Sequence, residues 1–183
     1  MGRENLMMHF RIVRLSRERE RERESCFGPF QVTERAKLRY IAGKWSWKPM
    51  PVSSPWLKHY PVEAASDGME HVVFLCEDRG EPAGQVTLCM WWNHFAFVDR
   101  VDVAPAYRRK GVATMLLQRA KEWAREQNAR GLFTQTQDIN VPAMLLYEKC
   151  GFSLCGIDTM LYYNSPHRGE TAVFYYLLFP NDY

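Results

Sequence analysis

The chain has 183 residues, which is long enough for one domain with a complete hydrophobic core. Its composition, 46% hydrophobic and 25% charged, excludes a disordered, collagen-like or coiled-coil chain as a description of the whole. The net charge of +3 divides into +6 over residues 1–48 (12 bases, 6 acids) and −3 over the remainder, so the body of the chain lacks the basic excess of a nucleic-acid-binding domain.

Targeting and redox features indicate a reducing, cytoplasmic protein. The longest apolar stretch, Thr171–Phe179, is too short to cross a bilayer, and residues 1–10 contain no apolar segment typical of a signal peptide. Five cysteines without a CxxC pair argue against both a disulfide framework and a zinc site. We therefore expect no membrane partner and no metal.

The first third of the chain predicts little regular structure. Residues 16–25, Ser-Arg-Glu-Arg-Glu-Arg-Glu-Arg-Glu-Ser, are typical of a solvated, ion-paired surface segment or a disordered linker rather than a functional arm. Aromatic and β-branched residues between Phe30 and Met50 predict one or two strands, or a strand and a turn. Prolines at 51, 55 and 61 predict a loop-rich stretch with one helical turn at Trp56–Tyr60.

From residue 71 onward, the pattern predicts an α+β domain. Runs of apolar residues bounded by turn residues predict strands, and apolar residues at helical spacing predict a helix at Gly111–Asn128. A second helix is predicted at Val141–Cys150, closed by Gly151. The order βββ-α-β-α-ββ indicates a mixed central sheet of about six to seven strands flanked by helices. The expected strands are His71–Cys76, Ala83–Met90, Phe95–Val103, Leu132–Gln137, Ser153–Tyr163 and Thr171–Phe179.

The segment Val101–Thr114 predicts an anion site. A strand ends at Pro105, an Arg-Arg-Lys turn follows at 108–110, and Gly111 and Ala113 open a helix. The first N–H groups of a helix have no backbone partner and, with the helix dipole, favour negative charge. Because the small residues let a pyrophosphate approach the backbone, we interpret the segment as a phosphate site rather than an ordinary helix start with basic surface residues.

A second motif begins at Asn140. Asn140 and Tyr147 are seven residues apart, nearly two helical turns, so they share one face of the second predicted helix. Asn140 can offer amide hydrogen bonds, and Tyr147 can present a phenol proton to a reacting group. Taken alone, Tyr147 is better interpreted as an ordinary core residue of an amphipathic helix.

Together the motifs resemble a known superfamily. Arg108-x-x-Gly111-x-Ala113, followed by Asn140-x-x-Ala143-x-x-Leu146-Tyr147-Glu148-Lys149-x-Gly151-Phe152, resembles the GNAT superfamily of acyl-CoA N-acyltransferases over about residues 70–179. A narrower resemblance, to streptothricin (nourseothricin-type) acetyltransferases, extends back to about residue 29. It is carried by Thr134–Val141, Gly156–Tyr162, Glu170–Tyr176, Pro29–Val32, Arg39-Tyr40, Trp45, Glu122–Ala124 and Trp92-Asn93 before the strand bearing Asp99. We therefore divide the chain into a basic, low-complexity extension, 1–28, and one acetyltransferase domain, 29–183.

The resemblance implies acetyl-CoA as the cofactor. Its pyrophosphate would lie on the backbone N–H groups at the helix start, and its pantetheine arm would pair with the strand edge at Val101–Val103, which splays from the Leu132–Gln137 strand. Asn140 would hydrogen-bond the pantetheine, and Tyr147 would protonate the departing thiolate. The implied cofactor-binding residues are Val101, Asp102, Val103, Arg108, Arg109, Lys110, Gly111, Val112, Ala113, Thr114 and Asn140.

For the acceptor, the resemblance implies direct transfer of acetyl to the β-lysine amine of a streptothricin-class antibiotic, with resistance as the outcome. Asp99 would act as the base, directly or through water, or would only hold the substrate cation; both roles stay open. A cationic substrate is recognised by carboxylates and ring faces. The candidates are Asp99, Asp158, Glu170, Tyr40, Trp45 and Trp92, against core packing for the tryptophans and ordinary solvated charge for Asp158 and Glu170.

Two other readings remain. An acetyltransferase of this kind could act on a protein N-terminus, a lysine or a polyamine. A non-enzymatic acyl-CoA sensor, with the Arg/Glu segment binding a partner, would not need Tyr147 or Asp99. The sequence leaves the oligomeric state open, a homodimer included.

Overall fold

The computed structural model describes residues 8–60 and 69–180, and these form nine strands and two α-helices with two short 3-10 helices. The elements in chain order are β1 (Phe10–Arg14), η1 (Arg17–Cys26), β2 (Phe30–Ile41), β3 (Lys44–Lys58), β4 (Val72–Asp78), β5 (Glu81–Met90), β6 (Ala96–Val103), η2 (Pro105–Tyr107), α1 (Val112–Glu126), β7 (Gly131–Gln137), α2 (Val141–Lys149), β8 (Ser153–Asp158) and β9 (Ala172–Leu178).

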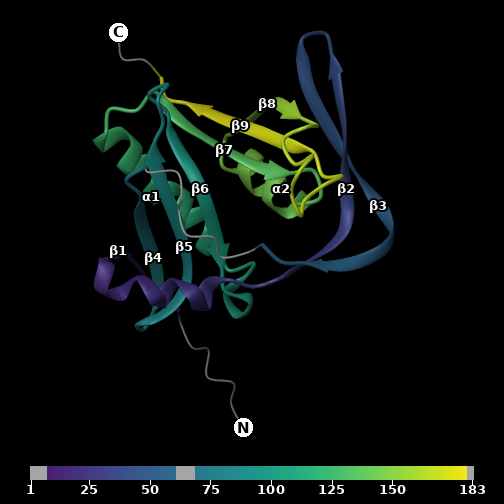
Figure 1. The fold of residues 1–183 in the computed structure, drawn as a ribbon. Helices are drawn as coiled ribbons and strands as arrows, with labels where there is room; N and C mark the ends of the chain where they lie inside the picture. Colours follow the sequence, from purple (N-terminus) through teal and green to yellow (C-terminus); the bar gives the residue numbers. More distant parts are fainter. Residues whose placement is uncertain (1–7, 61–68, 181–183) are drawn as a thin grey trace.

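Seven strands form one mixed sheet in the order β1-β4-β5-β6-β7-β9-β8 (Figure 1). Its neighbouring strands pair antiparallel except β6 and β7, which are parallel and joined by the crossover helix α1. The α+β class and the mixed sheet are therefore confirmed.

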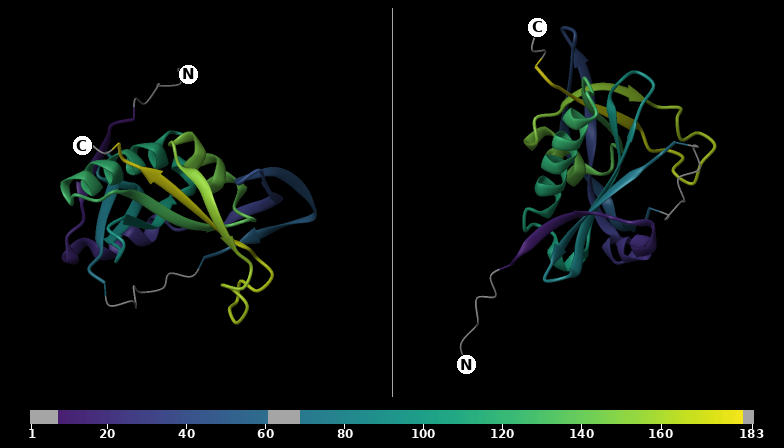
Figure 2. Two further views of the ribbon diagram at one scale, coloured as in Figure 1. Left: turned by 90° about the horizontal axis from the view of Figure 1, so that it is seen from above. Right: turned by 90° about the vertical axis from the view of Figure 1, so that its left-hand side faces the viewer.

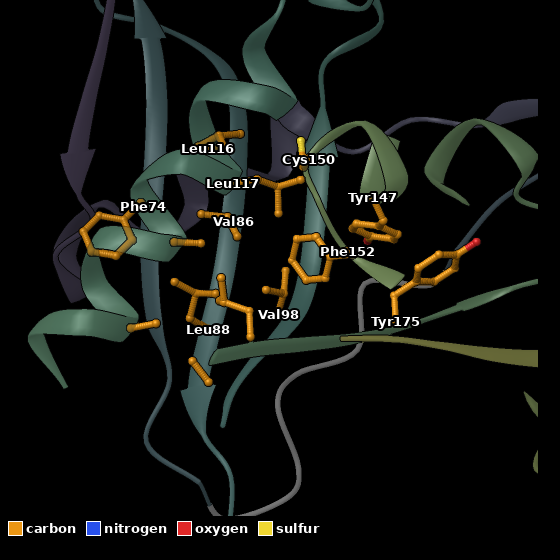
Figure 3. Packing of buried hydrophobic residues seen from close by; sticks show 14 of the residues in the cluster. Phe74, Val86, Leu88, Val98, Leu116, Leu117, Tyr147, Cys150, Phe152 and Tyr175 are labelled. Atoms are coloured by element: carbon orange, nitrogen blue, oxygen red, sulfur yellow. The ribbon is translucent and has the colours of Figure 1, made fainter. Parts of the chain in front are cut away.

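The sheet separates two layers (Figure 2). Helices α1 and α2 lie on one face, and η1 and the β8–β9 connection lie on the other. Helix α1 turns Val112, Leu116, Leu117, Ala120, Trp123 and Ala124 inward, as the helical spacing of its apolar residues predicts. These side chains form the main hydrophobic core with Val86, Leu88 and Val98 of the sheet (Figure 3).

Strands β2 and β3 form a separate two-stranded hairpin that stands beside the C-terminal edge of the sheet (Figure 1). The helical turn predicted at Trp56–Tyr60 is wrong, because Trp56 pairs with Val32 in the hairpin and β3 continues to Lys58. The backbone N–H of Ala36 donates to the carbonyl of Asp138 at 2.8 Å and so fixes the hairpin beside the end of β7. Pro61 lies outside the described residues.

The elements expected after residue 71 are present, with one shortened. Strand β8 ends at Asp158 rather than Tyr163, because the Asp158 carboxylate accepts the N–H groups of Met160 and Leu161 at 2.7 and 3.0 Å and turns the chain. Before residue 29 the structure adds two elements that the sequence did not predict: β1, which pairs with β4 at the sheet edge, and η1 over residues 17–26. No helix within the described ranges has the length and apolar character to cross a membrane.

Candidate functional site

The central feature of the site is a separation of two neighbouring strands. Strands β6 and β7 pair only over Ala96–Val98 and Leu132–Thr134 within the described residues, although β6 continues to Val103 and β7 to Gln137. The side chain of Thr134 donates to the carbonyl of Val98 at 2.8 Å at the last shared pair. Beyond it the two strands diverge, as the resemblance implied, and we call the gap between their backbones the opening (Figure 1).

The start of α1 has the geometry of an anion site. Gly111, the N-cap, has a left-handed backbone (φ 86°) and offers no side chain, and a Cβ at this position would meet open space. Met115 N–H makes the first helical bond, to the Gly111 carbonyl, so the N–H groups of Val112, Ala113 and Thr114 precede the helical ladder. Arg109 is also left-handed (φ 64°), a conformation that a non-glycine residue adopts rarely.

The basic side chains of this loop differ in what they contact. The Arg108 guanidinium donates to three backbone carbonyls: Val103 at 3.1 Å, Pro29 at 2.6 Å and Gly28 at 3.1 Å. The ammonium of Lys110 lies 5.4 Å from the ring centre of Tyr107. The sequence analysis placed the Arg108 side chain among the positive groups around the anion. In the structure this side chain instead points toward the protein and contacts backbone carbonyls.

Tyr147 lies on α2, buried against the rings of Phe152 and Tyr175, with centre distances of 5.6 and 5.8 Å (Figure 3). Burial raises the pKa of its phenol, and a hydrogen bond with the Thr134 side chain partly opposes that rise. Because Thr134 marks the point where β6 and β7 separate, the phenol stands at the apex of the opening as a protonated group.

Asn140 caps α2: its side-chain oxygen accepts the N–H of Ala143 at 3.3 Å. Its side chain also hydrogen-bonds Tyr60, whose hydroxyl donates to Gln137 at 2.6 Å. Asn140 is thus fixed at the end of β7, on the far side of the opening from the strand edge of β6.

Two acidic residues of β6 lie in different surroundings. Asp99 is exposed and is the extra residue of a β-bulge, because Val98 pairs with Leu88 and Arg100 with Thr87. Asp102 is partly buried and accepts from Gln85 at 2.6 Å and Arg100 at 2.7 Å.

Asp158 and Glu170, the remaining charged candidates, make contacts outside the separated strands. Asp158 forms the turn after β8 through its carboxylate. Glu170 pairs with the ammonium of Lys58, which also contacts Nδ1 of His167 at 2.9 Å. Neither carboxylate lies on β6 or β7, the strands that form the opening.

The aromatic candidates are dispersed. The rings of Tyr40 and Trp45 are tilted against each other, with centres 4.9 Å apart, beside the tip of the β2–β3 hairpin, which projects away from the sheet (Figure 1). Trp92 is 83% exposed in the β5–β6 turn, at the end of β6 opposite the anion site. The structure does not bring these three rings to the separated strands.

A different set of rings lies beside the opening. Phe97 and Phe133 are stacked at 4.6 Å where β6 and β7 are still paired, Tyr176 stacks on Phe133 at 5.4 Å, and Trp91 lies 5.3 Å from Phe97. Phe97 is two residues before Asp99. Because residues i and i+2 of a strand share a face, the sequence could have indicated Phe97 once Asp99 was a candidate. We call Trp91, Phe97, Phe133 and Tyr176 the aromatic platform.

Sequence reasoning also missed a polar cluster at the end of β7. The Tyr162 hydroxyl accepts from the side-chain amides of Gln135 and of Gln137, the latter at 2.9 Å, and burial raises its pKa. Tyr60 bonds Gln137 from the other side. These contacts join the β8–β9 connection to the segment after β3, a pairing with no local sequence signal.

Comparison with known proteins gives a consistent match. Residues 38–152 match the family model described as the acetyltransferase (GNAT) family. Streptothricin acetyltransferase A of Bacillus subtilis (strain 168) is 36% identical over 161 residues, covering 82% of this chain and 90% of the relative. A streptothricin acetyltransferase of Escherichia coli is 38% identical over 124 residues, covering 67% and 71% of the two chains.

Solved structures agree. The crystal structure of a nourseothricin acetyltransferase superimposes with a TM-score of 0.80 at 28% identity, covering 93% of this chain and 99% of the other. A Bacillus anthracis (str. Ames) protein, solved in complex with acetyl coenzyme A, superimposes with a TM-score of 0.82 at 26% identity, covering 93% and 100%.

Proposed function

Because the chain belongs to the GNAT family of acetyltransferases, we propose that it transfers the acetyl group of acetyl-CoA to the β-lysine amine of a streptothricin-class antibiotic. The observation that carries the proposal is the opening between β6 and β7 with the protonated Tyr147 phenol at its apex. The acetylated drug loses a positive charge that it needs for its RNA target, so the cell is protected.

The residues at the opening fit the cofactor. The uncapped N–H groups of Val112, Ala113 and Thr114, beside the open space at Gly111, suit a diphosphate. The edge of β6 at Val101–Val103 offers backbone groups to the amides of a pantetheine arm, in the manner of an added strand. Bound there, acetyl-CoA supplies an activated acetyl thioester.

The chain's own residues then manage two protons. The amine must lose a proton to attack the acetyl carbon, and Asp99 accepts that proton directly or through water. A C–N bond forms, the C–S bond breaks, and Tyr147 gives its phenol proton to the departing thiolate sulfur. The raised pKa of Tyr147 keeps this proton in place at neutral pH. No covalent bond to the protein is required.

The acceptor side suits a cation. The exposed Asp99 lies two residues after Phe97, one ring of the aromatic platform, and π-faces of such rings attract cations. A β-lysine tail carries ammonium groups on an aliphatic stem, which match a carboxylate and ring faces respectively. A cytoplasmic location is supported by the five cysteines, all in the thiol form.

An amine panel tests the proposal. The purified chain is incubated with acetyl-CoA and, separately, streptothricin, spermidine, a peptide with a free N-terminal alanine, and a lysine peptide, and each product is identified by its mass. We expect kcat/KM for streptothricin to exceed the others by about tenfold or more, a difference of about 1.4 kcal/mol in transition-state binding.

The outcomes separate the parts of the proposal. Transfer to a peptide or polyamine with no transfer to streptothricin would retain the acetyltransferase activity and overturn the acceptor. A chain that binds CoA but acetylates none of the four amines would contradict both the acetyltransferase activity and the proposed acceptor.

A further inference from the structure

After the edge strand β1, the segment Arg17–Pro29 crosses one face of the sheet and ends beside the loop that precedes α1 (Figure 1). We call Arg17–Pro29 the strap. It consists of η1 and the three residues after it, and it lies on the face opposite α1 (Figure 2). Both of its ends are attached to the sheet through named side chains.

The first attachment is at Glu77 of β4, whose side chain is only 2% exposed. Its carboxylate accepts from Arg11 of β1 at 2.8 Å and also from Arg19 of the strap, which in turn bonds Glu22 at 2.6 Å. A buried carboxylate requires such partners, since removing one would leave an uncompensated charge. Glu77 therefore holds the beginning of η1 against β4.

The second attachment is at the end of β6. Cys26 is fully buried, and the guanidinium of Arg100 lies 4.4 Å from the ring centre of Phe27. Arg100 also donates to Asp102, which accepts from Gln85 of β5. The C-terminal end of the strap is thereby packed on the strand whose edge faces the opening.

The third attachment is Arg108, in the loop itself. The N–H groups at its Nη1 and Nη2 donate to the carbonyls of Pro29 and Gly28, and the Nε–H donates to the carbonyl of Val103. One planar guanidinium therefore joins the strap to the end of β6. The contact is close: a Cβ on Gly28 would lie 2.9 Å from Cγ of Pro105 and 3.2 Å from Nη2 of Arg108.

We propose that the strap is part of the cofactor site, and that Arg108 is a positioning residue that fixes the Pro105–Gly111 loop against it. The loop sets the left-handed turns at Arg109 and Gly111, which aim the first N–H groups of α1 outward. Arg108 thus acts through backbone carbonyls, and the diphosphate of CoA is bound by the N–H groups that it holds in place. The inference rests on the proposed function for the identity of that ligand.

The test is a pair of identical substitutions. Gly28→Ala places a methyl group against Pro105 and Arg108, whereas Gly156→Ala in β8 places one in open space. Neither glycine has a positive φ, so neither substitution introduces the strain of a left-handed backbone. Dissociation constants for CoA are measured by titration calorimetry, and KM values for acetyl-CoA and for the amine by thiol release.

We expect Gly28→Ala to weaken CoA binding by about fivefold to thirtyfold, as a forced contact in a packed site does. KM for acetyl-CoA should rise while KM for the amine stays unchanged, a split that general destabilisation would not produce. Gly156→Ala should bind CoA as the parent chain does. Equal CoA affinities for the two variants would overturn the inference.

Two further variants keep the inference falsifiable if Gly28→Ala fails to fold. Arg108→Lys keeps the charge and loses the fork, so a positioning role predicts about the same loss as Gly28→Ala, and a direct charge role predicts affinity close to the parent. Arg19→Ala releases the strap at Glu77, remote from the loop, and should weaken CoA binding in the same direction. If both variants bind CoA as the parent chain does, the strap has no role in the cofactor site. If the parent chain itself fails to bind CoA, the proposed function is rejected instead.

Discussion

Replacement of Tyr147 by phenylalanine removes one oxygen atom from the apex of the opening. The ring contacts with Phe152 and Tyr175 remain, and Thr134 keeps its 2.8 Å bond to the Val98 carbonyl. The stability cost is therefore that of one net hydrogen bond, about 0.5–1.5 kcal/mol. A general acid contributes about 10²–10⁴ in rate, or about 2.7–5.4 kcal/mol, so the catalytic loss should exceed the loss in stability.

The assay is steady-state thiol release with saturating amine, and urea unfolding gives the stability. We expect kcat to fall by about 10²–10⁴ with KM for acetyl-CoA within about twofold of the parent. Since the pKa of Tyr147 lies above its ordinary value of 10, the loss of activity caused by its ionisation should occur only above pH 10 in the parent.

Tyr175→Phe is the matched control. Tyr175 is buried in the same ring cluster, but its hydroxyl donates to Glu148 at 3.3 Å on the side away from Phe152 (Figure 3). The Tyr175→Phe variant should lose about as much free energy of unfolding as Tyr147→Phe and should keep the kcat of the parent chain. A Tyr147→Phe enzyme with a kcat within about threefold of the parent would refute the acid role, because so small a change is below what a positioned acid supplies.

Two predictions concern stability. Arg11 and Arg19 hold the pKa of Glu77 below its usual 4.5, so the ion pairs stabilise the fold above that pH and the contribution disappears as pH falls through the lowered pKa. Glu77→Gln should cost about 1–3 kcal/mol in urea unfolding at pH 7 and much less at pH 3; an equal deficit at both would contradict the ionic origin. Gly84→Ala would place a Cβ 2.7 Å from Val112 Cγ1 and 2.8 Å from the Asp102 carbonyl oxygen. This overpacking should lower the free energy of unfolding by about 1–3 kcal/mol. Urea stability equal to that of the parent chain would contradict the close approach.

The elements after residue 71 could be predicted because their causes are local. In α1, apolar side chains recur at helical spacing, and turn residues separate the β-strands, which are short runs rich in apolar and β-branched residues. The N-terminal elements have causes elsewhere in the chain. The alternating Arg/Glu run of η1 has no apolar face, and its ordered structure depends on Glu77, about sixty residues away.

The prolines of β3 were misleading for a similar reason. They indicate a loop when read alone, but β3 has a partner on one side only, and an edge strand tolerates residues without an N–H donor. A one-sided hairpin cannot be inferred from residues 44–58 by themselves, since the pairing with β2 decides it.

The features of the candidate site also differ in whether their causes are local in the sequence. The anion loop and Tyr147 lie within two short motifs, so their positions follow from local spacing. The rings of the aromatic platform come from four segments of the sheet and its turns, and only strand pairing brings them together. Residue type alone therefore favoured Tyr40, Trp45 and Trp92, which the structure places elsewhere.

The three-pair junction between β6 and β7 also has a consequence for the lifetime of the protein in the cell. An uncovered strand edge is a template for association with other chains, and here the edge lies in the interior of the sheet rather than at its rim. A cofactor that covers this edge stabilises the fold by mass action, by about 2.7 kcal/mol at a concentration of 100 times Kd. The abundance of the enzyme should therefore follow the acetyl-CoA pool, so that starvation for carbon lowers the amount of folded protein as well as the supply of its substrate.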